Sequence, residues 1–235
     1  MNPTFTIDVG DCLDVMREIP SESIGAVVTD APYGVDFISD WSPKGTPGKR
    51  SKIANDRHPF VWWLHDAARV LRPGSPLVSF CRWDTAEAFR MAIEWAGLSI
   101  RGQVIWDRVD HGMGDLKSTP GPQHDTIWIA AKGRYQFPGK RPKSVVRHRR
   151  VHAHELKHPN EKPLDLMLEL ISSYTHPGST ILDPFAGSGT TGIAGLMKGH
   201  NVRLIEIDPG YAEISRQRCA QAIADGAPQQ YSGAG

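Results

Sequence analysis

The sequence has little that would suit secretion or a membrane. It contains only three cysteines, Cys12, Cys81 and Cys219, spread over 235 residues. This number and spacing argue against a disulfide framework or a cysteine-based zinc site and favour a reducing cytosol. No apolar run approaches the roughly 18 residues of a membrane span, and the N-terminus lacks a signal-peptide pattern. We therefore expect a cytoplasmic protein.

A marked excess of charge of either sign is also absent. The 27 Lys and Arg residues stand against 26 Asp and Glu, a formal net charge of +1. Any attraction for nucleic acid must therefore come from a local patch. The length and the 40% hydrophobic content suit one sizeable core. We expect a single domain over residues 1–225 and a frayed tail over residues 226–235.

The sequence does contain a glycine-rich turn between an apolar run and a helical segment, ILDPFAGSGTTGIA at residues 181–194. Gly187, Gly189 and Gly192 allow a tight turn and a close approach to a ligand, towards which the following helix would direct its free N–H groups. Glu206 ends the next strand-like run at the spacing of a ribose-binding acid. A nicotinamide-dependent oxidoreductase is one interpretation of this pattern.

Two features of the turn disfavour a phosphate ligand. Asp183 lies at the expected strand end, where its carboxylate would repel a pyrophosphate, and no lysine follows Gly189 as a Walker A loop requires. A carboxylate at this place suits an ammonium group better. The string DPFAGSGTT resembles the cofactor loop of S-adenosylmethionine-dependent DNA amino-methyltransferases, in which the acid binds the methionine amino group and the loop surrounds the methionine tail.

A second motif, DAPYG, follows the apolar run IGAVVT at residues 24–29. It begins where a buried parallel strand should end, which is the edge of an open α/β sheet that binds ligands. The exocyclic amine of a base is a poor nucleophile because its lone pair is conjugated with the ring. A carboxylate from Asp30 and a nearby backbone carbonyl, each accepting an N–H, would draw the nitrogen towards tetrahedral geometry. Tyr33 could then stack on the base, and Pro32 would hold the turn rigid.

This turn resembles the [D/N/S]-P-P-[Y/F/W] motif of the same family, with one departure. Ala31 stands in place of the first proline, which should loosen the turn slightly. The resemblance implies a catalytic set of Asp30, Ala31, Pro32 and Tyr33. Methyltransferases that act on RNA or on protein glutamine share a similar turn and remain alternatives.

Further cofactor residues follow from two weaker resemblances. GDCLDVM resembles the start of many amino-methyltransferases, where the acid, here Asp11, faces the adenine of the cofactor; Asp11 can also cap a helix. HPNEKP resembles the H-P-x-x-K-P element, in which Lys162 is placed to hold the cofactor carboxylate, although a surface lysine is an alternative. The full set implied for S-adenosylmethionine is Asp11, Cys12, Lys162, Asp183, Pro184, Phe185, Ala186, Gly187, Ser188, Gly189, Thr190, Thr191, Glu206 and Ile207.

Two basic segments are expected to contact double-stranded DNA. Residues 39–58 predict a mobile loop that would form a lid over DNA, with a solvated loop as the alternative. Residues 132–157 hold nine Lys or Arg and one acid, at the place where this family inserts its target-recognition region. The histidines of this segment fit no closed zinc spacing, so no metal is expected. The predicted DNA-binding residues are Lys49, Arg50, Lys140, Arg141, Lys143, Arg147, Arg149 and Arg150.

The order of the motifs is that of the beta group of the family: catalytic turn, basic insertion, then cofactor loop. This group is a circular reordering of the common methyltransferase sheet, so the resemblance implies a mostly parallel seven-stranded α/β sheet with helices on both faces. Seven strand-like runs agree with it: 5–9, 24–29, 77–81, 99–106, 126–131, 180–182 and 202–207. Adenine N6 is the preferred target because Asp at the catalytic position is typical of adenine enzymes, and cytosine N4 is the alternative. A homodimer and a restriction endonuclease partner are further expectations.

Overall fold

The computed structural model describes residues 2–34, 59–111, 117–118, 120–151 and 161–226, and the backbone of residues 38–39 and 51–52. The predicted DNA-binding residues Lys49 and Arg50 lie outside the described residues, as do most of the 39–58 segment and of the 226–235 tail. Two short strands, β3 (Ile38–Ser39) at the start of the 39–58 segment and β4 (Ser51–Lys52) within it, pair antiparallel.

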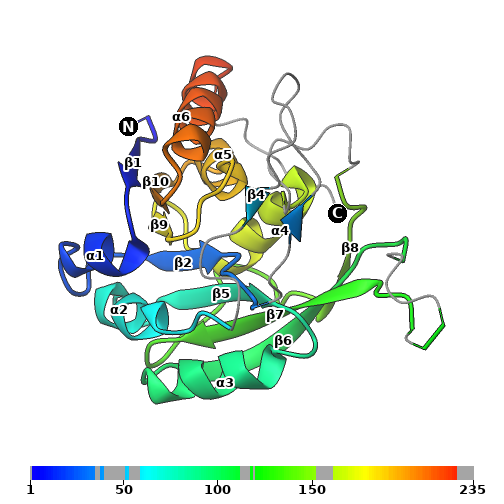
Figure 1. Cartoon of the computed structure of the whole chain (residues 1–235). Helices are drawn as coiled ribbons and strands as arrows, with labels where there is room; N and C mark the ends of the chain where they lie inside the picture. Colours follow the sequence, from blue (N-terminus) through cyan, green and yellow to red (C-terminus); the bar gives the residue numbers. More distant parts are fainter. Residues whose placement is uncertain are drawn as a thin grey trace.

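One eight-stranded sheet forms the centre of the molecule (Figure 1). Its strands are parallel except β7, which runs antiparallel to both of its neighbours. This agrees with the predicted α/β class and mostly parallel sheet. The spatial order is β1 (Phe5–Val9), β10 (Asn201–Glu206), β9 (Thr180–Asp183), β2 (Ala26–Thr29), β5 (Pro76–Cys81), β7 (His124–Ala131), β6 (Ser99–Asp107) and β8 (Val145–Arg147).

The prediction of seven strands was wrong by one. All seven expected runs form strands, and β8 adds an edge strand from within the basic segment, with Val145 paired to Ile105 of β6. A three-residue run among charged residues carries no readable periodicity. It becomes a strand because the edge of β6 offers backbone partners, and the Val146 side chain is buried there.

Helices cover both faces of the sheet, as the resemblance implied (Figure 1). Three lie together on one face and three on the other. The first set is α1 (Cys12–Arg17), α2 (Trp63–Val70) and α3 (Ala86–Trp95), and the second is α4 (Leu164–Tyr174), α5 (Thr190–Met197) and α6 (Pro209–Ala224). Because helices cover both faces, the central strands β2 and β5 are buried along their whole length.

The strand order reverses between β9 and β2. From β9 the chain passes through α5 to β10 on one side, and from β2 it passes through α2 to β5 on the other. These two strands pair in parallel, Ala26 with Ile181 and Val27 with Leu182, so their carboxyl ends lie side by side. In open α/β sheets a ligand crevice lies at this reversal. The fold therefore brings together the two ends that carry Asp30 and Asp183.

Candidate active site

Asp30 directly follows β2 and carries one engaged and one free carboxylate oxygen. Its side chain is 20% exposed, and its Oδ2 is paired with Nζ of Lys162. Oδ1 is buried and has no hydrogen-bond partner among the residues that the structure describes. A buried acceptor without a hydrogen-bond partner is energetically unfavourable. Its presence here points to a ligand that donates a hydrogen bond to this oxygen.

The charge state of Asp30 results from opposing influences. Burial is the largest and raises its pKa, the Lys162 ammonium lowers it, and the carboxylates of Asp125 and Asp183 raise it; the net result is a pKa raised to about 6. Because this pKa lies below 7, the group is mainly ionised at neutral pH. Asp30 is thus mainly a carboxylate at the strand reversal, with one oxygen available as an acceptor.

Lys162 is held beside Asp30 by the surrounding aromatic rings. Its Nζ donates to the Tyr33 hydroxyl at 3.3 Å and lies 5.6 Å from the Tyr33 ring centre and 5.1 Å from that of Phe80. Lys162 therefore stands within the predicted catalytic set, although the resemblance placed it with the cofactor.

The remainder of the catalytic turn is firmly packed. The Ala31 and Tyr33 side chains are buried, and the carbonyl of Pro32 accepts a hydrogen bond from the Phe60 N–H at 3.2 Å. Substitution of the first proline by Ala31 was expected to loosen this turn. Ala31 is buried, and the hydrogen bond from Phe60 ties the turn to the chain just before α2; the effect of Ala31 on the rigidity of the turn stays a prediction.

Asp183 ends β9 and is almost fully buried. Its Oδ1 accepts from the Thr29 hydroxyl at 2.6 Å and from the Phe185 N–H at 3.0 Å. Burial raises its pKa, and hydrogen bonds from Thr191 and Thr29 oppose that shift. Thr29 was not among the predicted residues; it immediately precedes Asp30, and its hydroxyl joins the two strand ends.

The glycine turn after Asp183 needs glycine for two reasons. Gly187 and Gly189 have φ angles of 51° and 84°, a backbone region that other residues rarely adopt. At Gly192 an added Cβ would stand 2.7 Å from Leu204 and 2.8 Å from Cys219. Gly192 therefore serves the packing of α5 against β10 and α6, whereas Gly187 and Gly189 shape the turn itself.

Residues of the turn are tied to their surroundings by several contacts. Phe185 meets Trp63 edge-on at 5.4 Å, and the Ser188 carbonyl accepts from Arg218 at 2.8 Å. Glu161 forms an ion pair with Arg218 at 2.7 Å and accepts from the Thr190 hydroxyl at 3.4 Å. Glu161 and Arg218 were missed from the sequence because no local pattern links them. Pro184, Ala186, Gly187, Ser188, Gly189, Thr190 and Thr191 are all buried.

Glu206 ends β10 and binds the glycine turn through its carboxylate. Its Oε2 accepts from the Gly187 N–H at 2.7 Å and its Oε1 from the Asp208 N–H at 2.9 Å. Burial raises its pKa. Each oxygen retains a second lone pair with which a ribose hydroxyl could bond.

The ends of β1 and β10 form a partly apolar border beside Glu206. Val9 and Ile207 are each 48% exposed, and Val9 pairs with Glu206 in the sheet. Asp11 caps α1 by accepting from the Leu13 N–H at 2.9 Å. Cys12 is buried and burial raises its pKa to about 12, so its thiol stays neutral. An adenine ring has both apolar contacts and an acceptor available at this border.

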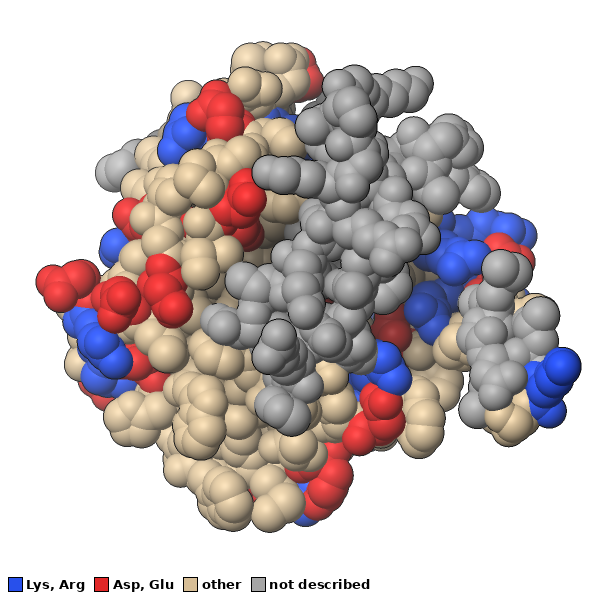
Figure 2. All heavy atoms as spheres, viewed as in Figure 1, with Lys and Arg blue, Asp and Glu red and all other residues tan. Residues whose placement is uncertain are grey.

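The basic segment lies at the opposite edge of the sheet from β1. Figure 2 shows Lys and Arg atoms gathered, with acidic atoms among them, on the side where Figure 1 places β8. Arg147 pairs with Asp107 at 3.3 Å and Arg149 with Asp110 at 2.7 Å. Their side chains are 67% and 66% exposed, so these pairs are weak and can exchange for phosphates. Lys140, Arg141, Lys143 and Arg150 are exposed.

His148 joins the basic segment to the helical layer. Its Nε2 lies 2.5 Å from Glu169 of α4, and its carbonyl accepts from the Trp106 indole at 2.8 Å. Within the described ranges no group of three or more His, Cys, Asp or Glu side chains is placed to hold a metal ion. None of the helices described is long and apolar enough to span a membrane.

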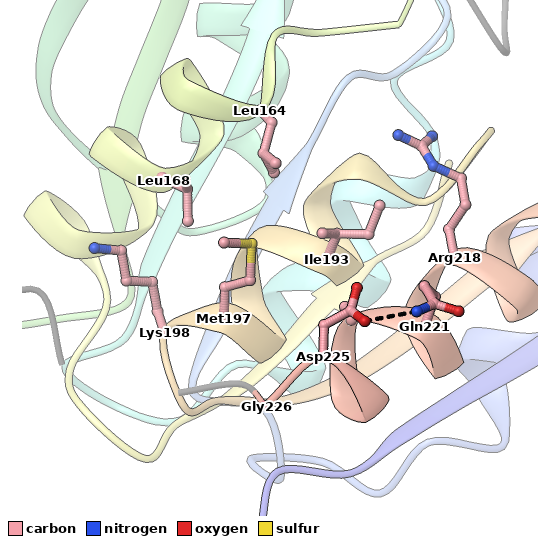
Figure 3. A pocket seen from close by; sticks show the side chains of 10 residues that line it. Leu164, Leu168, Ile193, Met197, Lys198, Arg218, Gln221, Asp225 and Gly226 are labelled. Carbon is pink, nitrogen blue, oxygen red and sulfur yellow. Dashed lines mark hydrogen bonds between the residues drawn. The ribbon is translucent and has the colours of Figure 1, made fainter. Parts of the chain in front are cut away.

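A separate groove lies on the flank of α5, between α4 and α6 (Figure 3). Its volume is about 470 Å³, and its walls include Leu164, Ile193 and Met197, with the hydrogen-bonded pair Gln221 and Asp225 at one end. None of the predicted catalytic or cofactor residues lines it. The candidate active site is thus the edge of the sheet at Asp30 and Asp183, and not this groove.

Comparison with known proteins adds a family and a fold. Residues 24–217 match the N6_N4_Mtase family, described as DNA methylase. A protein of Escherichia coli (strain K12) named as a methylase, YubD, is 33% identical over 215 residues, which cover 90% of this chain and 88% of YubD. The type II methyltransferase M2.MboI of Moraxella bovis is 26% identical over 246 residues, covering 91% and 87%. The crystal structure of an M1.HpyAVI–SAM complex is 20% identical with a TM-score of 0.71, covering 92% of this chain and all of that one.

Proposed function

The chain belongs to the N6_N4_Mtase family of DNA methylases, and from this we propose that it transfers a methyl group from S-adenosylmethionine to the exocyclic amine of a base in double-stranded DNA, with adenine N6 preferred. The observation that carries the proposal is the free Oδ1 of Asp30, a buried acceptor with no partner among the described residues. It lies at the strand reversal, next to the end of β9 that bears Asp183.

The residues present suit S-adenosylmethionine. Asp183 offers a buried carboxylate for the methionine ammonium, and Gly187 and Gly189 adopt the left-handed backbone that lets the turn beside it fold tightly. Glu206 offers lone pairs for the ribose, and Ile207 an apolar surface for the adenine. M1.HpyAVI, which shares this fold, was crystallised with SAM. When bound, the cofactor supplies a methyl group on a sulfonium, which becomes a thioether as the methyl carbon bonds to the amine nitrogen.

The catalytic turn orients the amine. Asp30 Oδ1 accepts one amine N–H, and the Ala31 carbonyl accepts the other; the neighbouring Pro32 carbonyl already has one donor, the Phe60 N–H. Both acceptors draw the lone pair out of conjugation and towards the methyl donor. The ammonium formed after transfer is acidic, so its proton can leave to solvent without a strong base. Asp30 therefore acts as an orienting acceptor first.

Adenine is preferred over cytosine because an aspartate occupies position 30. The family includes both N6 and N4 enzymes by name, so family membership leaves the base open. The preference rests on the family resemblance, in which aspartate at this position is typical of adenine enzymes and serine occupies it in many cytosine enzymes.

The direct test is to methylate duplex DNA with the purified protein and to separate the nucleosides by mass spectrometry. We expect N6-methyladenine. Detection of N4-methylcytosine without N6-methyladenine would refute the assignment of adenine as the target, but the proposed methylation of an exocyclic amine would stand. Asp30→Ala should bind S-adenosylmethionine with wild-type affinity yet lose nearly all turnover, and Asp30→Asn, which keeps a carbonyl, should retain a trace.

Other substrates are tested with the same protein. Transfer of the methyl group to RNA or to protein glutamine, and not to duplex DNA, would show that the substrate belongs to another class. Tight binding of NADH without binding of S-adenosylmethionine would favour the oxidoreductase. The restriction endonuclease partner and the homodimer stay predictions; M2.MboI, a type II methyltransferase, supports the first.

A further inference from the structure

We infer that Lys162 is a positioning residue for methyl transfer, which fixes the Asp30 carboxylate by binding Oδ2 so that Oδ1 is the oxygen that meets the amine. The inference rests on the proposed function. It assigns Lys162 to Asp30, whereas the sequence resemblance assigned it to the carboxylate of the cofactor.

The geometry leaves the Lys162 ammonium little freedom. Its side chain is 10% exposed and stands among the Tyr33 and Phe80 rings. Two of its three N–H groups are engaged, one by Asp30 Oδ2 and one by the Tyr33 hydroxyl. Because the chain enters α4 only two residues later, the backbone that carries Lys162 is also held in place. The ammonium is thus preorganised on one oxygen of Asp30.

The contact with Lys162 makes the two oxygens of the Asp30 carboxylate different, because it prevents the carboxylate from rotating. With Oδ2 held by Lys162, the lone pairs of Oδ1 have a defined direction and no protein donor. An amine that donates to Oδ1 therefore finds a fixed acceptor and pays no reorganisation cost. A lysine that left Asp30 to bind the cofactor carboxylate would lose this effect.

The charges around Asp30 explain why a cation is needed there. The Asp125 carboxylate at the start of β7 and Asp183 at the end of β9 both disfavour a second negative charge, as does burial. The Tyr33 hydroxyl accepts from Lys162, and burial raises the pKa of the nearby Cys81 thiol on β5, which stays neutral. Lys162 is the group that opposes these effects. Its removal should raise the pKa of Asp30 above about 6 and leave more of it protonated near neutrality.

The experiment compares Lys162→Met and Lys162→Arg with wild type in single-turnover methylation of DNA from about pH 5 to about pH 9. The wild-type rate should rise with ionisation of Asp30, around pH 6. We call this rise on the acidic side of the pH–rate profile the acid limb. In Lys162→Met the acid limb should move to a pH at least one unit higher, so that at a pH well below the limb the rate falls about tenfold relative to wild type. Lys162→Arg restores the positive charge and should return the limb towards wild type.

Two further measurements separate this role from others. Calorimetry should show S-adenosylmethionine affinity unchanged in Lys162→Met, whereas a lysine that binds the cofactor carboxylate would weaken it. Lys198→Met removes the same charge from the C-terminal end of α5, outside the site, and should leave both the limb and the affinity unchanged.

The inference is overturned if the acid limb of Lys162→Met stays at its wild-type position, whether or not cofactor affinity falls. Should Lys162→Met fail to fold, a wild-type limb position in Lys162→Gln would have the same meaning. Failure of the proposed function looks different, because wild type would then methylate DNA at no pH. In that case infrared titration of the carboxyl band, with Asp30→Asn subtracted, still reports whether Lys162 controls protonation of Asp30.

Discussion

Asp183 and Glu206 are buried carboxylates at neighbouring strand ends, and they differ in the groups that already occupy them. Asp183 bonds to side chains and to one local N–H. Glu206 instead satisfies two backbone N–H groups, those of Gly187 and Asp208. Loss of the Glu206 carboxylate would therefore leave backbone donors of the glycine turn unpaired.

The two residues should respond differently to mutation. Asp183→Asn removes the charge at nearly constant shape and should weaken S-adenosylmethionine binding by about 1.5–3 kcal/mol, or about 10- to 150-fold. Glu206→Ala should weaken binding and also lower the free energy of unfolding by about 1–3 kcal/mol for each N–H left buried and unpaired. Calorimetry and denaturant unfolding measure the two effects.

Glu213→Gln is the matched control, because this exposed acid on α6 pairs with Arg216 and Gln217 of its own helix. It should change neither quantity. If cofactor affinity were unaltered in both Asp183→Asn and Glu206→Ala, the proposed S-adenosylmethionine site at these two residues would be excluded.

At the scale of elements, the start of α5 depends on a close approach to α6. Gly189 has a φ of 84°, and an added Cβ would overlap the Ser215 side chain and stand 3.1 Å from its Cα. Gly199 has a similar φ of 75°, but no atom lies within 4 Å of its Cβ position. The two glycines therefore share the backbone strain and differ in the space around them.

Substitution of both glycines should separate strain from space. Gly199→Ala should cost about 1 kcal/mol of stability from the left-handed backbone alone. Gly189→Ala adds a steric conflict and should cost a further 1–3 kcal/mol or so, together with loss of cofactor binding. Equal destabilisation in urea unfolding would show that contact with α6 does not constrain this turn.

Strand β8 holds the predicted basic segment against the edge of the sheet. It places Arg147 beside Asp107, while Arg149 just beyond it pairs with Asp110. The arginine of each pair is largely exposed, so the pair should open at little cost when a phosphate approaches. The Arg150 side chain is also exposed.

Neutralising these arginines should flatten the salt dependence of DNA binding. Each lost phosphate contact removes about 0.9 from the slope of log affinity against log salt, so Arg147→Gln, Arg149→Gln and Arg150→Gln combined should lower it by up to about 2.7. Arg216→Gln on α6, at the other edge of the sheet, removes a similarly paired arginine and should leave the slope unchanged. If the triple variant kept the wild-type slope, the phosphate contacts would lie elsewhere.

At the scale of the whole molecule, the site is recessed at the edge of the sheet. Asp30 Oδ1 is buried, and a paired base keeps its amine inside the duplex. The two can meet only if the base leaves the helix. The overall shape therefore predicts extrusion of the target base.

Base extrusion can be measured directly. A mismatch at the target position lowers the cost of unpairing by up to a few kcal/mol, so binding to mismatched DNA should be tighter than to matched DNA. A 2-aminopurine at the target should brighten in the complex, and the same probe two positions away should stay dim. A dim signal at the target, with intact methylation, would contradict extrusion.

The sequence by itself determined the elements and the chemistry of their ends. Seven strands follow from apolar runs, and the DAPYG and DPFAGSGTT motifs each lie within one strand-to-turn unit. Such signals are local: hydrophobic periodicity and turn residues act between near neighbours in the chain. The strand-end position of Asp30 and Asp183 could therefore be predicted, as could the α/β class.

Only the tertiary structure decided which of these groups meet. Lys162 reaches Asp30 across 132 positions and Thr29 reaches Asp183 across 154, and no local pattern specifies such pairs. The same holds for β8, a three-residue strand that exists because β6 offers an open edge. Long-range contacts depend on where packed elements place side chains. For that reason the sequence associated Lys162 with the cofactor, and the fold placed it beside Asp30.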